Sequence, residues 1–231
     1  MFVIPAPLQA SVAVAGTADR FPVRRIFCVG RNYAAHAREM GKDPDREPPF
    51  FFTKPADAVV DSGVTIPYPV GTNDLHHEIE LVVALGKPGS DVPVDEATSL
   101  IWGAGVGIDL TRRDLQAEAK NLARPWDLAK GFDRSAPIAP LTPLADVPSL
   151  TAGRISLAVN GTVRQEGDLS EMIWPVADTI AYLSKFIALA PGDLIMTGTP
   201  SGVAAVGPGD VMIGEVEGLT PLETPLGPRQ S

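Results

Sequence analysis

The stretch HHEIELVVAL, residues 76–85, predicts a strand that ends at Gly86 and carries two carboxylates. On a strand, Glu78 and Glu80 share one face, while Ile79 and Leu81 point to the other face, into a core. Two like charges side by side on so apolar a strand are unfavourable unless a positive group lies between them. A metal ion would supply that charge; the alternative is an edge strand with a solvated acidic face.

A second apolar strand, SLIWGAGVGID over residues 99–109, ends at another acidic residue, Asp109. Asp109 is either a third ligand beside Glu78 and Glu80 or the N-cap of a helix that is predicted over residues 111–121. A set of three carboxylates is an all-oxygen site, which suits Mg²⁺ or Mn²⁺ better than zinc, with Ca²⁺ less apt for an open catalytic position.

Outward from these two strands, short apolar runs bounded by Gly and Pro predict a β-rich α+β fold. The high counts, Gly 22 and Pro 23 in 231 residues, favour strands and turns over a helical bundle. A helix is predicted over residues 172–189, with Pro175 in its first turn. Residues 24–231 are expected to form a single catalytic domain, on which residues 1–23 pack as a short extension. Further strands are predicted over residues 24–30, 50–53, 155–159, 162–166, 194–197 and 210–217.

The charge and cysteine content exclude some classes of protein. A formal net charge of −9 lacks the basic footprint that nucleic-acid binding requires. With Cys28 as the single cysteine, no disulfide can form within the chain, and a buried structural thiol is expected there. No apolar run approaches the length of a membrane span, and the first residues lack a cationic signal region, so a cytoplasmic location is expected.

Two further groups have the chemistry of catalysts. His36 and Glu39 are three residues apart on a helix predicted over residues 34–40, so the carboxylate could orient the imidazole as a general base for water. An exposed surface pair is the alternative. Lys130 lies among apolar neighbours in PWDLAKGFD, where its amine could stabilise an oxyanion or enolate. A surface lysine whose stem alone is buried is the alternative there.

Polar side chains on the helix after Asp109 and in a later turn could bind a substrate acid. Arg113 and Gln116 are three apart on the predicted helix and offer a cation and an amide, although an ordinary solvated face has the same pattern. Thr199, in the turn TGTP, could present a hydroxyl and backbone donors, or could serve the turn alone. The residues themselves thus indicate a carboxylate metal site and a candidate histidine base, but no particular reaction.

The sequence around these residues resembles the fumarylacetoacetate hydrolase family, in its short acylpyruvate/fumarylpyruvate hydrolase branch. The resemblance spans about residues 24 to 217 and keeps the order of the family's motifs. These are VGRNYAAHAREMG (29–41), FFFTKPADAVV (50–60), DLHHEIELVVALG (74–86), GVGIDLTRRDLQ (105–116), RPWDLAKGFDRSAPI (124–138), LAVNGTVRQEG (157–167) and GDLIMTGTPSGV (192–203).

The resemblance implies a mixed β-sandwich roll, typically dimeric, with a defined set of site residues. The family's H-x-E-x-E motif falls on His76, Glu78 and Glu80, and its third acidic ligand falls on Asp109. The implied catalytic residues are His36, Glu39 and Lys130, with the histidine–glutamate pair carried on a lid. The implied substrate contacts are Arg113, Gln116, Thr199, Arg31 and Lys54.

The implied activity is the metal-dependent hydrolysis of a carbon–carbon bond in a 2,4-dioxo acid, most simply fumarylpyruvate to fumarate and pyruvate, as in gentisate breakdown. The distal carboxylate of that substrate would need a cation, and Arg31, Arg112 and Arg134 are candidates. Decarboxylation of oxaloacetate is the alternative activity, because it passes through the same pyruvate enolate. A binding protein that keeps the ligands without the chemistry is a third hypothesis, against which the presence of His36, Glu39 and Lys130 together argues.

Overall fold

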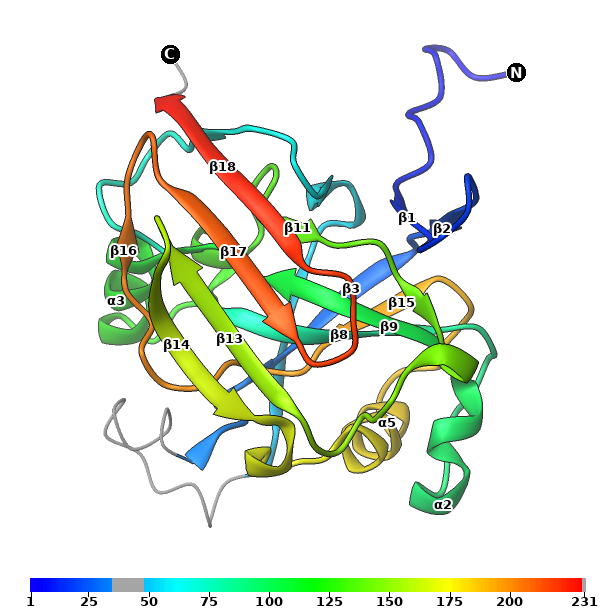
Figure 1. The fold of residues 1–231 in the computed structure, drawn as a ribbon. Coiled ribbons are helices and arrows are strands. Elements are labelled where there is room, and N and C mark those ends of the chain that lie inside the picture. The colour runs from blue at the N-terminus through cyan, green and yellow to red at the C-terminus, as the bar shows by residue number, and fades with distance from the viewer. Residues whose placement is uncertain (35–47, 230–231) are drawn as a thin grey trace.

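The structure, a computed structural model, describes residues 1–34 and 48–229, and these residues form four β-sheets (Figure 1). The largest is a mixed sheet with β8 (Ile79–Leu85) and β9 (Ile101–Ile108) at its centre. Its order is β4 (Phe50–Lys54), β3 (Arg25–Gly30), β15 (Asp193–Met196), β8, β9, β11 (Ala136–Ile138) and β5 (Val59–Asp61), and β12 (Thr142–Pro143) also pairs with β9. The pairs β3–β15 and β5–β11 are parallel and the others are antiparallel.

A second sheet of five strands lies against the first and is in front of it in Figure 1. Its order is β14 (Thr162–Asp168), β13 (Arg154–Val159), β17 (Val211–Val216), β18 (Leu222–Arg229) and β6 (Ile66–Tyr68). Two small sheets complete the set: β10 (Thr111–Arg112), β7 (Leu75–His76) and β16 (Ala205–Val206) form one, and β1 (Ser11–Ala13) and β2 (Arg20–Pro22) form the other. The described α-helices are α2 (Val94–Ala97), α3 (Arg113–Asn121), α4 (Asp127–Lys130) and α5 (Val176–Ser184).

Strand β8 is buried on both faces because its alternate residues enter two different cores. Ile79 and Leu81 belong to the main core between the two large sheets, whereas Val82 packs in a second core that includes residues of β1 and β2. The sheets approach closely at Gly214 of β17, where an added Cβ would lie 2.5 Å from Ile79 Cδ1. The β-rich α+β class is therefore confirmed, and the edge-strand alternative for residues 76–85 is wrong.

Most predicted strands are found within two residues of their expected bounds, and three predictions need correction. The strand over residues 76–85 is split into β7 and β8, which leaves Glu78 between them. The helix predicted over residues 172–189 is shorter and consists of α5. Pro175 has an extended backbone (ψ 160°) and occupies the N-cap position, so the helix begins at Val176. Helix α3 begins at Arg113 because residues 111 and 112 pair with β7 as the short strand β10. The helix predicted over residues 34–40 lies outside the described residues.

The N-terminal hairpin of β1 and β2 packs on the large sheet. Val12 and Phe21 are buried in the second core together with Ile26 of β3, and Val14 makes a bridge to Leu141. The boundary between an extension and a catalytic domain at residue 23 stays a prediction. Cys28 is fully buried, as expected, and burial raises the pKa of its thiol. Within the described residues, no helix combines the length and hydropathy required to cross a bilayer.

Candidate active site

Three carboxylates meet where β8 and β9 run side by side. Glu80 is on β8, Glu78 precedes that strand, and Asp109 follows β9. The antiparallel register sets Ile79 opposite Ile108, and the Asp109 N–H donates to the Glu78 carbonyl at 2.8 Å. One carboxylate oxygen from each residue lies within 4.8 Å of the other two. Glu78, Glu80 and Asp109 are 6 %, 1 % and 0 % exposed. The predicted convergence of the three carboxylates is therefore present in the fold. Asp109 is not the N-cap of α3, since that position is occupied by Arg112.

Among residues 1–34 and 48–229, three cations contact this acidic triad. Lys130 Nζ, at the end of α4, donates to Glu78 Oε2 at 2.7 Å and to Asp109 Oδ2 at 2.6 Å. Lys54, at the end of β4, lies 2.8 Å from Asp109 Oδ1. Arg113, on α3, donates to Glu78 Oε1 at 2.6 Å and to Gln116 Oε1 at 2.6 Å. Lys130 is 1 % exposed, so the surface-lysine alternative is wrong.

The electrostatics of the triad favour a bound cation. Burial, and then the charges of Asp109 and Glu78, raise the pKa of Glu80 well above its usual value. Burial lowers the pKa of Lys130, but the two carboxylates outweigh burial, so its pKa is raised and it is an ammonium ion at neutral pH. That ammonium bridges two ligand carboxylates, as a metal ion would.

The donor set fits a hard divalent ion. The buried Asp109 Oδ1 accepts no hydrogen bond of good geometry, although Lys54 Nζ is close, because the lysine donates instead to the carbonyls of Leu110 and Lys130. A buried carboxylate oxygen without a hydrogen bond has a lone pair available to a metal ion, and three carboxylate oxygens suit Mg²⁺ or Mn²⁺.

The turn after β15 completes the floor of the site. The Gly198 N–H donates to Glu80 Oε2 at 2.7 Å. Gly198 has a φ of +94°, and a Cβ there would lie 2.7 Å from the Cβ of Asn32, so only glycine suits the position. Thr199 follows and is 3 % exposed. The turn therefore supplies a backbone donor to a triad carboxylate, and it places the Thr199 hydroxyl beside the triad.

Gln165, on β14, connects two parts of the site and was not anticipated from the sequence. Its Oε1 accepts from the Ile79 N–H at 3.1 Å and lies 2.7 Å from His77 Nδ1. Its Nε2 donates to Thr199 Oγ1 at 2.8 Å and to the Pro200 carbonyl at 2.9 Å. Gln165 is fully buried. Its side chain thus connects the Ile79 N–H, next to Glu78, with the turn that contains Thr199. Nothing in the polar run TVRQEGD distinguishes this glutamine from its neighbours.

Asn32 fixes the chain as it leaves β3. Its side chain donates to the carbonyls of Thr197 and Trp174 at 2.7 and 2.9 Å, and it accepts from the Trp174 N–H at 2.7 Å. Arg31, which precedes it, has a φ of +59°. The next residues of interest, His36 and Glu39, lie outside the described residues, so the proposed histidine–glutamate pair stays a prediction.

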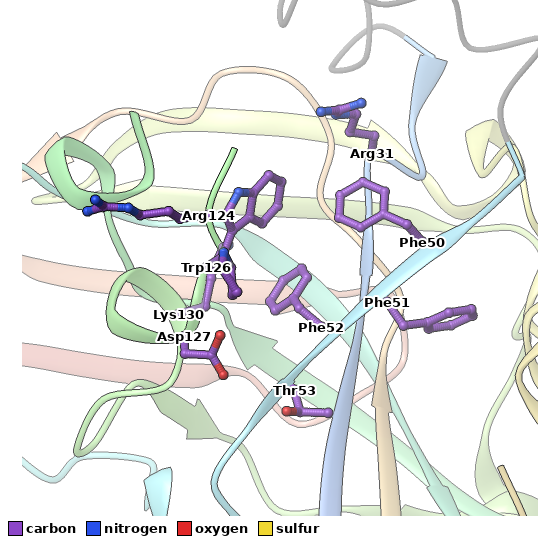
Figure 2. A pocket seen from close by; sticks show the side chains of 10 residues that line it. Arg31, Phe50, Phe51, Phe52, Thr53, Arg124, Trp126, Asp127 and Lys130 are labelled. Atoms are coloured by element: carbon purple, nitrogen blue, oxygen red, sulfur yellow. The ribbon is translucent and has the colours of Figure 1, made fainter. Parts of the chain in front are cut away.

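A narrow cleft lined by Glu78 and Glu80 shares residues with a larger cavity of about 650 Å³, whose lining side chains are drawn in Figure 2. Arg31, Phe52, Trp126 and Lys130 line both spaces. The edge of Phe50 meets the Trp126 ring at 5.2 Å between centroids, and Phe52 lies 5.8 Å from it. Neither Arg112, which packs on Phe132, nor Arg134 lines either space. Of the three candidate arginines, Arg31 is the one that borders the site.

Helix α3 contributes one more cation to the cleft than expected. Arg113, Gln116 and Lys120 all line it, at a spacing of three and then four residues that places side chains on one helix face. Burial lowers the pKa of Lys120 to about 8, with further lowering from the charges of Arg113 and Arg31. The 113, 116, 120 spacing is a signal in the sequence that could have identified this lysine.

Comparison with known proteins agrees with this geometry. Residues 25–226 match the family described as fumarylacetoacetate hydrolase, C-terminal. A crystal structure of fumarylpyruvate hydrolase from Pseudomonas aeruginosa, in complex with Mn²⁺ and pyruvate, is 50 % identical with a TM-score of 0.96, and the match covers 99 % of this chain and 100 % of that one.

Curated relatives extend the comparison. The fumarylpyruvate hydrolase of a Ralstonia species is 44 % identical over 83 % of this chain and all of the relative. The mitochondrial oxaloacetate decarboxylase of Dictyostelium discoideum is 40 % identical over 85 % of this chain and 90 % of the relative. A match over most of the chain, a shared fold and a buried acidic triad lead to one conclusion: this chain is an enzyme of the fumarylacetoacetate hydrolase family.

Proposed function

We propose that this enzyme hydrolyses a carbon–carbon bond in a 2,4-dioxo acid, with fumarylpyruvate, or another acylpyruvate, as substrate. The observation that carries the proposal is the buried triad of Glu78, Glu80 and Asp109 beside Lys130, in a fold that aligns with a fumarylpyruvate hydrolase holding Mn²⁺ and pyruvate. The triad is proposed to bind Mg²⁺ or Mn²⁺. Such an ion, when bound, supplies a Lewis acid for the keto-acid end of the substrate.

The cleft has donors suited to a keto acid. Arg113 holds Gln116 through a 2.6 Å hydrogen bond, and both line the cleft over the triad, where a guanidinium and an amide can orient a carboxylate. Thr199 Oγ1 is fixed by Gln165, so its proton is free to be aimed at a substrate oxygen. Lys54 packs beneath, where its charge offsets that of Asp109.

The proposed bond cleavage uses a base and an ammonium ion. His36, oriented by Glu39, would take a proton from water, and the hydroxide would add to the C4 carbonyl carbon. Lys130 would stabilise the resulting oxyanion with its Nζ–H donors. The C3–C4 bond then breaks with its electron pair on C3, so that C4 becomes a carboxylic acid. The remaining three-carbon fragment takes up a proton at C3 and leaves as pyruvate.

Steady-state assays with Mg²⁺ or Mn²⁺ test the proposal. Fumarylpyruvate and acetylpyruvate lose their enol absorbance on hydrolysis, and pyruvate release is measured with a coupled dehydrogenase. We expect metal-dependent hydrolysis that a chelator abolishes and that added Mn²⁺ restores. Failure to hydrolyse either acid with either metal, in protein that is folded by circular dichroism, would rule the proposed activity out.

Decarboxylation of oxaloacetate is the second candidate. It is favoured by the 40 % identity to an oxaloacetate decarboxylase and by chemistry, because loss of CO₂ from oxaloacetate leaves the same three-carbon fragment. Consumption of oxaloacetate with release of CO₂, and without hydrolysis of either dioxo acid, would reverse the ranking. A homodimer and a cytoplasmic location remain proposals, which gel filtration with light scattering and cell fractionation can test.

A further inference from the structure

Lys120 is a half-buried cation whose position is not explained by the acidic triad. Three other cations near the triad are each bound to it: Lys130 to Glu78 and Asp109, Lys54 to Asp109, and Arg113 to Glu78. Among the described residues, Lys120 makes neither a hydrogen bond nor an ion pair. The Trp126 ring offsets part of the lost hydration of Lys120, and a bound carboxylate would supply the acidic partner that it lacks.

Lys120 lines the cleft and packs on an aromatic residue that the cleft and the cavity share. Its Nζ lies 5.2 Å from the centre of the Trp126 ring, and Trp126 lines both spaces. The same ring contacts Phe50 and Phe52, which form the aromatic wall of the cavity in Figure 2. A substrate held at the triad by its keto-acid end would extend past this wall, so its far end would come near Lys120.

Besides Arg113 and Lys130, three described cations border the two spaces: Arg31 lines both, Arg124 lines the cavity and Lys120 lines the cleft. Arg31 lies over the Phe50 ring at 5.2 Å and borders both spaces. In the view of Figure 2, the Arg124 guanidinium points away from the aromatic cluster, and its side chain is 66 % exposed, 3.9 Å from Glu118. Lys120, on the same helix face as Arg113 and Gln116, is held by the element that would also orient the keto acid.

We propose that Lys120 is a specificity-determining residue that binds a carboxylate at the distal end of the acyl group. The preferred substrates are then dioxo acids whose acyl chain ends in an acid, rather than acylpyruvates with an apolar end. The rings of Phe52 and Trp126, tilted by 56° to each other, offer an apolar surface to the chain between the two acids. The inference rests on the proposed hydrolase activity and adds to it the chemical class of the acyl group.

The test compares two substrates across four proteins. Fumarylpyruvate carries the distal carboxylate and acetylpyruvate lacks it. The proteins are the wild type, Lys120→Met, Lys120→Arg and Lys185→Met. Lys185 is a matched control because it, too, lies over an aromatic ring, with its Nζ 5.7 Å from the Tyr182 centroid. It is exposed and follows a different helix, α5. The readout is the ratio of kcat/KM for fumarylpyruvate to that for acetylpyruvate at pH 7 with saturating Mg²⁺.

We expect Lys120→Met to lower this ratio about tenfold to a hundredfold, as the loss of one charge-assisted hydrogen bond predicts. Most of the change should be in the KM for fumarylpyruvate, because a remote contact is made equally in the ground state and the transition state. Lys120→Arg should recover much of the ratio, and Lys185→Met should match the wild type.

Two failures can be told apart. If the wild type hydrolyses both acids but Lys120→Met keeps a ratio within about threefold of the wild type, the assignment of Lys120 is wrong and the hydrolase proposal stands. The assignment is also wrong if Lys120→Met loses activity equally on both substrates, which would indicate a general rather than a distal role. If the wild type hydrolyses neither acid, the proposed function is wrong and the inference is rejected with it.

Discussion

Replacing Lys130 by methionine should destabilise the metal-free protein and abolish most of its turnover. Methionine fills a similar volume but removes the ammonium that donates to Glu78 at 2.7 Å and to Asp109 at 2.6 Å. All of these groups are buried. Removing one partner of a buried ion pair costs about 3–5 kcal/mol when the charge left behind is uncompensated. Because Lys54 still contacts Asp109 and Arg113 still contacts Glu78 in the variant, we expect the loss in the free energy of unfolding to lie toward the lower end of that range.

A divalent metal should restore more stability to the variant than to the wild type. In the wild type, the Lys130 ammonium and the metal ion compete for Glu78 and Asp109, whereas in Lys130→Met the ion no longer meets that competitor. Binding stabilises the folded state by RT ln(1 + [L]/Kd), or about 2.7 kcal/mol at a hundredfold excess over Kd. Turnover, in contrast, should fall about 10²- to 10³-fold even with saturating metal, as for the loss of one oxyanion donor.

Urea unfolding followed by tryptophan fluorescence, with a chelator and then with Mn²⁺, measures both effects on stability. Lys185→Met is the control, and its exposed position should keep its free energy of unfolding within about 0.5 kcal/mol of the wild type. Turnover of Lys130→Met above about a tenth of the wild-type value would exclude Lys130 as the oxyanion donor. A loss of less than about 1 kcal/mol in the metal-free variant would contradict the pairing of a buried ammonium with both carboxylates.

The other predictions concern the residues that position the site. Gln165→Leu keeps the volume but removes the bonds to the Ile79 N–H and Thr199, so Mn²⁺ affinity by calorimetry should fall about 10- to 100-fold; an unchanged affinity would assign Gln165 to packing alone. Gly198→Ala forces a side chain onto a φ of +94° and against Asn32, so urea unfolding should show a loss of more than about 1 kcal/mol, and an equal or greater stability would contradict the geometry. The pKa of Lys120 is about 8, and its neutral form cannot pair with an acid. The preference for fumarylpyruvate over acetylpyruvate should therefore be full well below pH 8 and decline as pH rises through that value; Lys120→Arg should remove the decline, and a flat wild-type profile would count against the role. The charged groups that influence Lys120 are those of Arg113, Arg31, Glu78 and Lys130.

The central strands and the triad could be predicted from the sequence because local patterns determine them. In residues 76–85 and 99–109, acidic residues stand at the ends of strands that are otherwise apolar, so their carboxylates need a common partner. The register of β8 and β9 then brings Glu78 beside Asp109, as the hydrogen bond between their backbones shows. The sequence does not predict the interruption at residues 77 and 78, because the residue pattern continues through it. At this break the Ile79 N–H donates to Gln165 Oε1, and Gln165 lies 86 residues from Ile79 in the sequence.

Residues whose role depends on tertiary contacts were missed for the same reason. Asn32 and Gln165 form their bonds with segments more than 30 residues away, and a polar side chain in a polar run carries no local sign of such partners. Strand β18 was missed because Pro and Gly interrupt LETPLGPR, a composition typical of a loop. Lys120 differs, since its helical spacing from Arg113 and Gln116 was readable in the sequence.

An anomalous-scattering map from a crystal of this enzyme soaked in Mn²⁺ tests the proposed metal site directly. We expect one strong peak per chain between the carboxylates of Glu78, Glu80 and Asp109, at ligand distances of about 2.0–2.2 Å, as small hard ions require. A map with no peak there, and with the three side chains turned away from one another, would contradict a metal-binding triad.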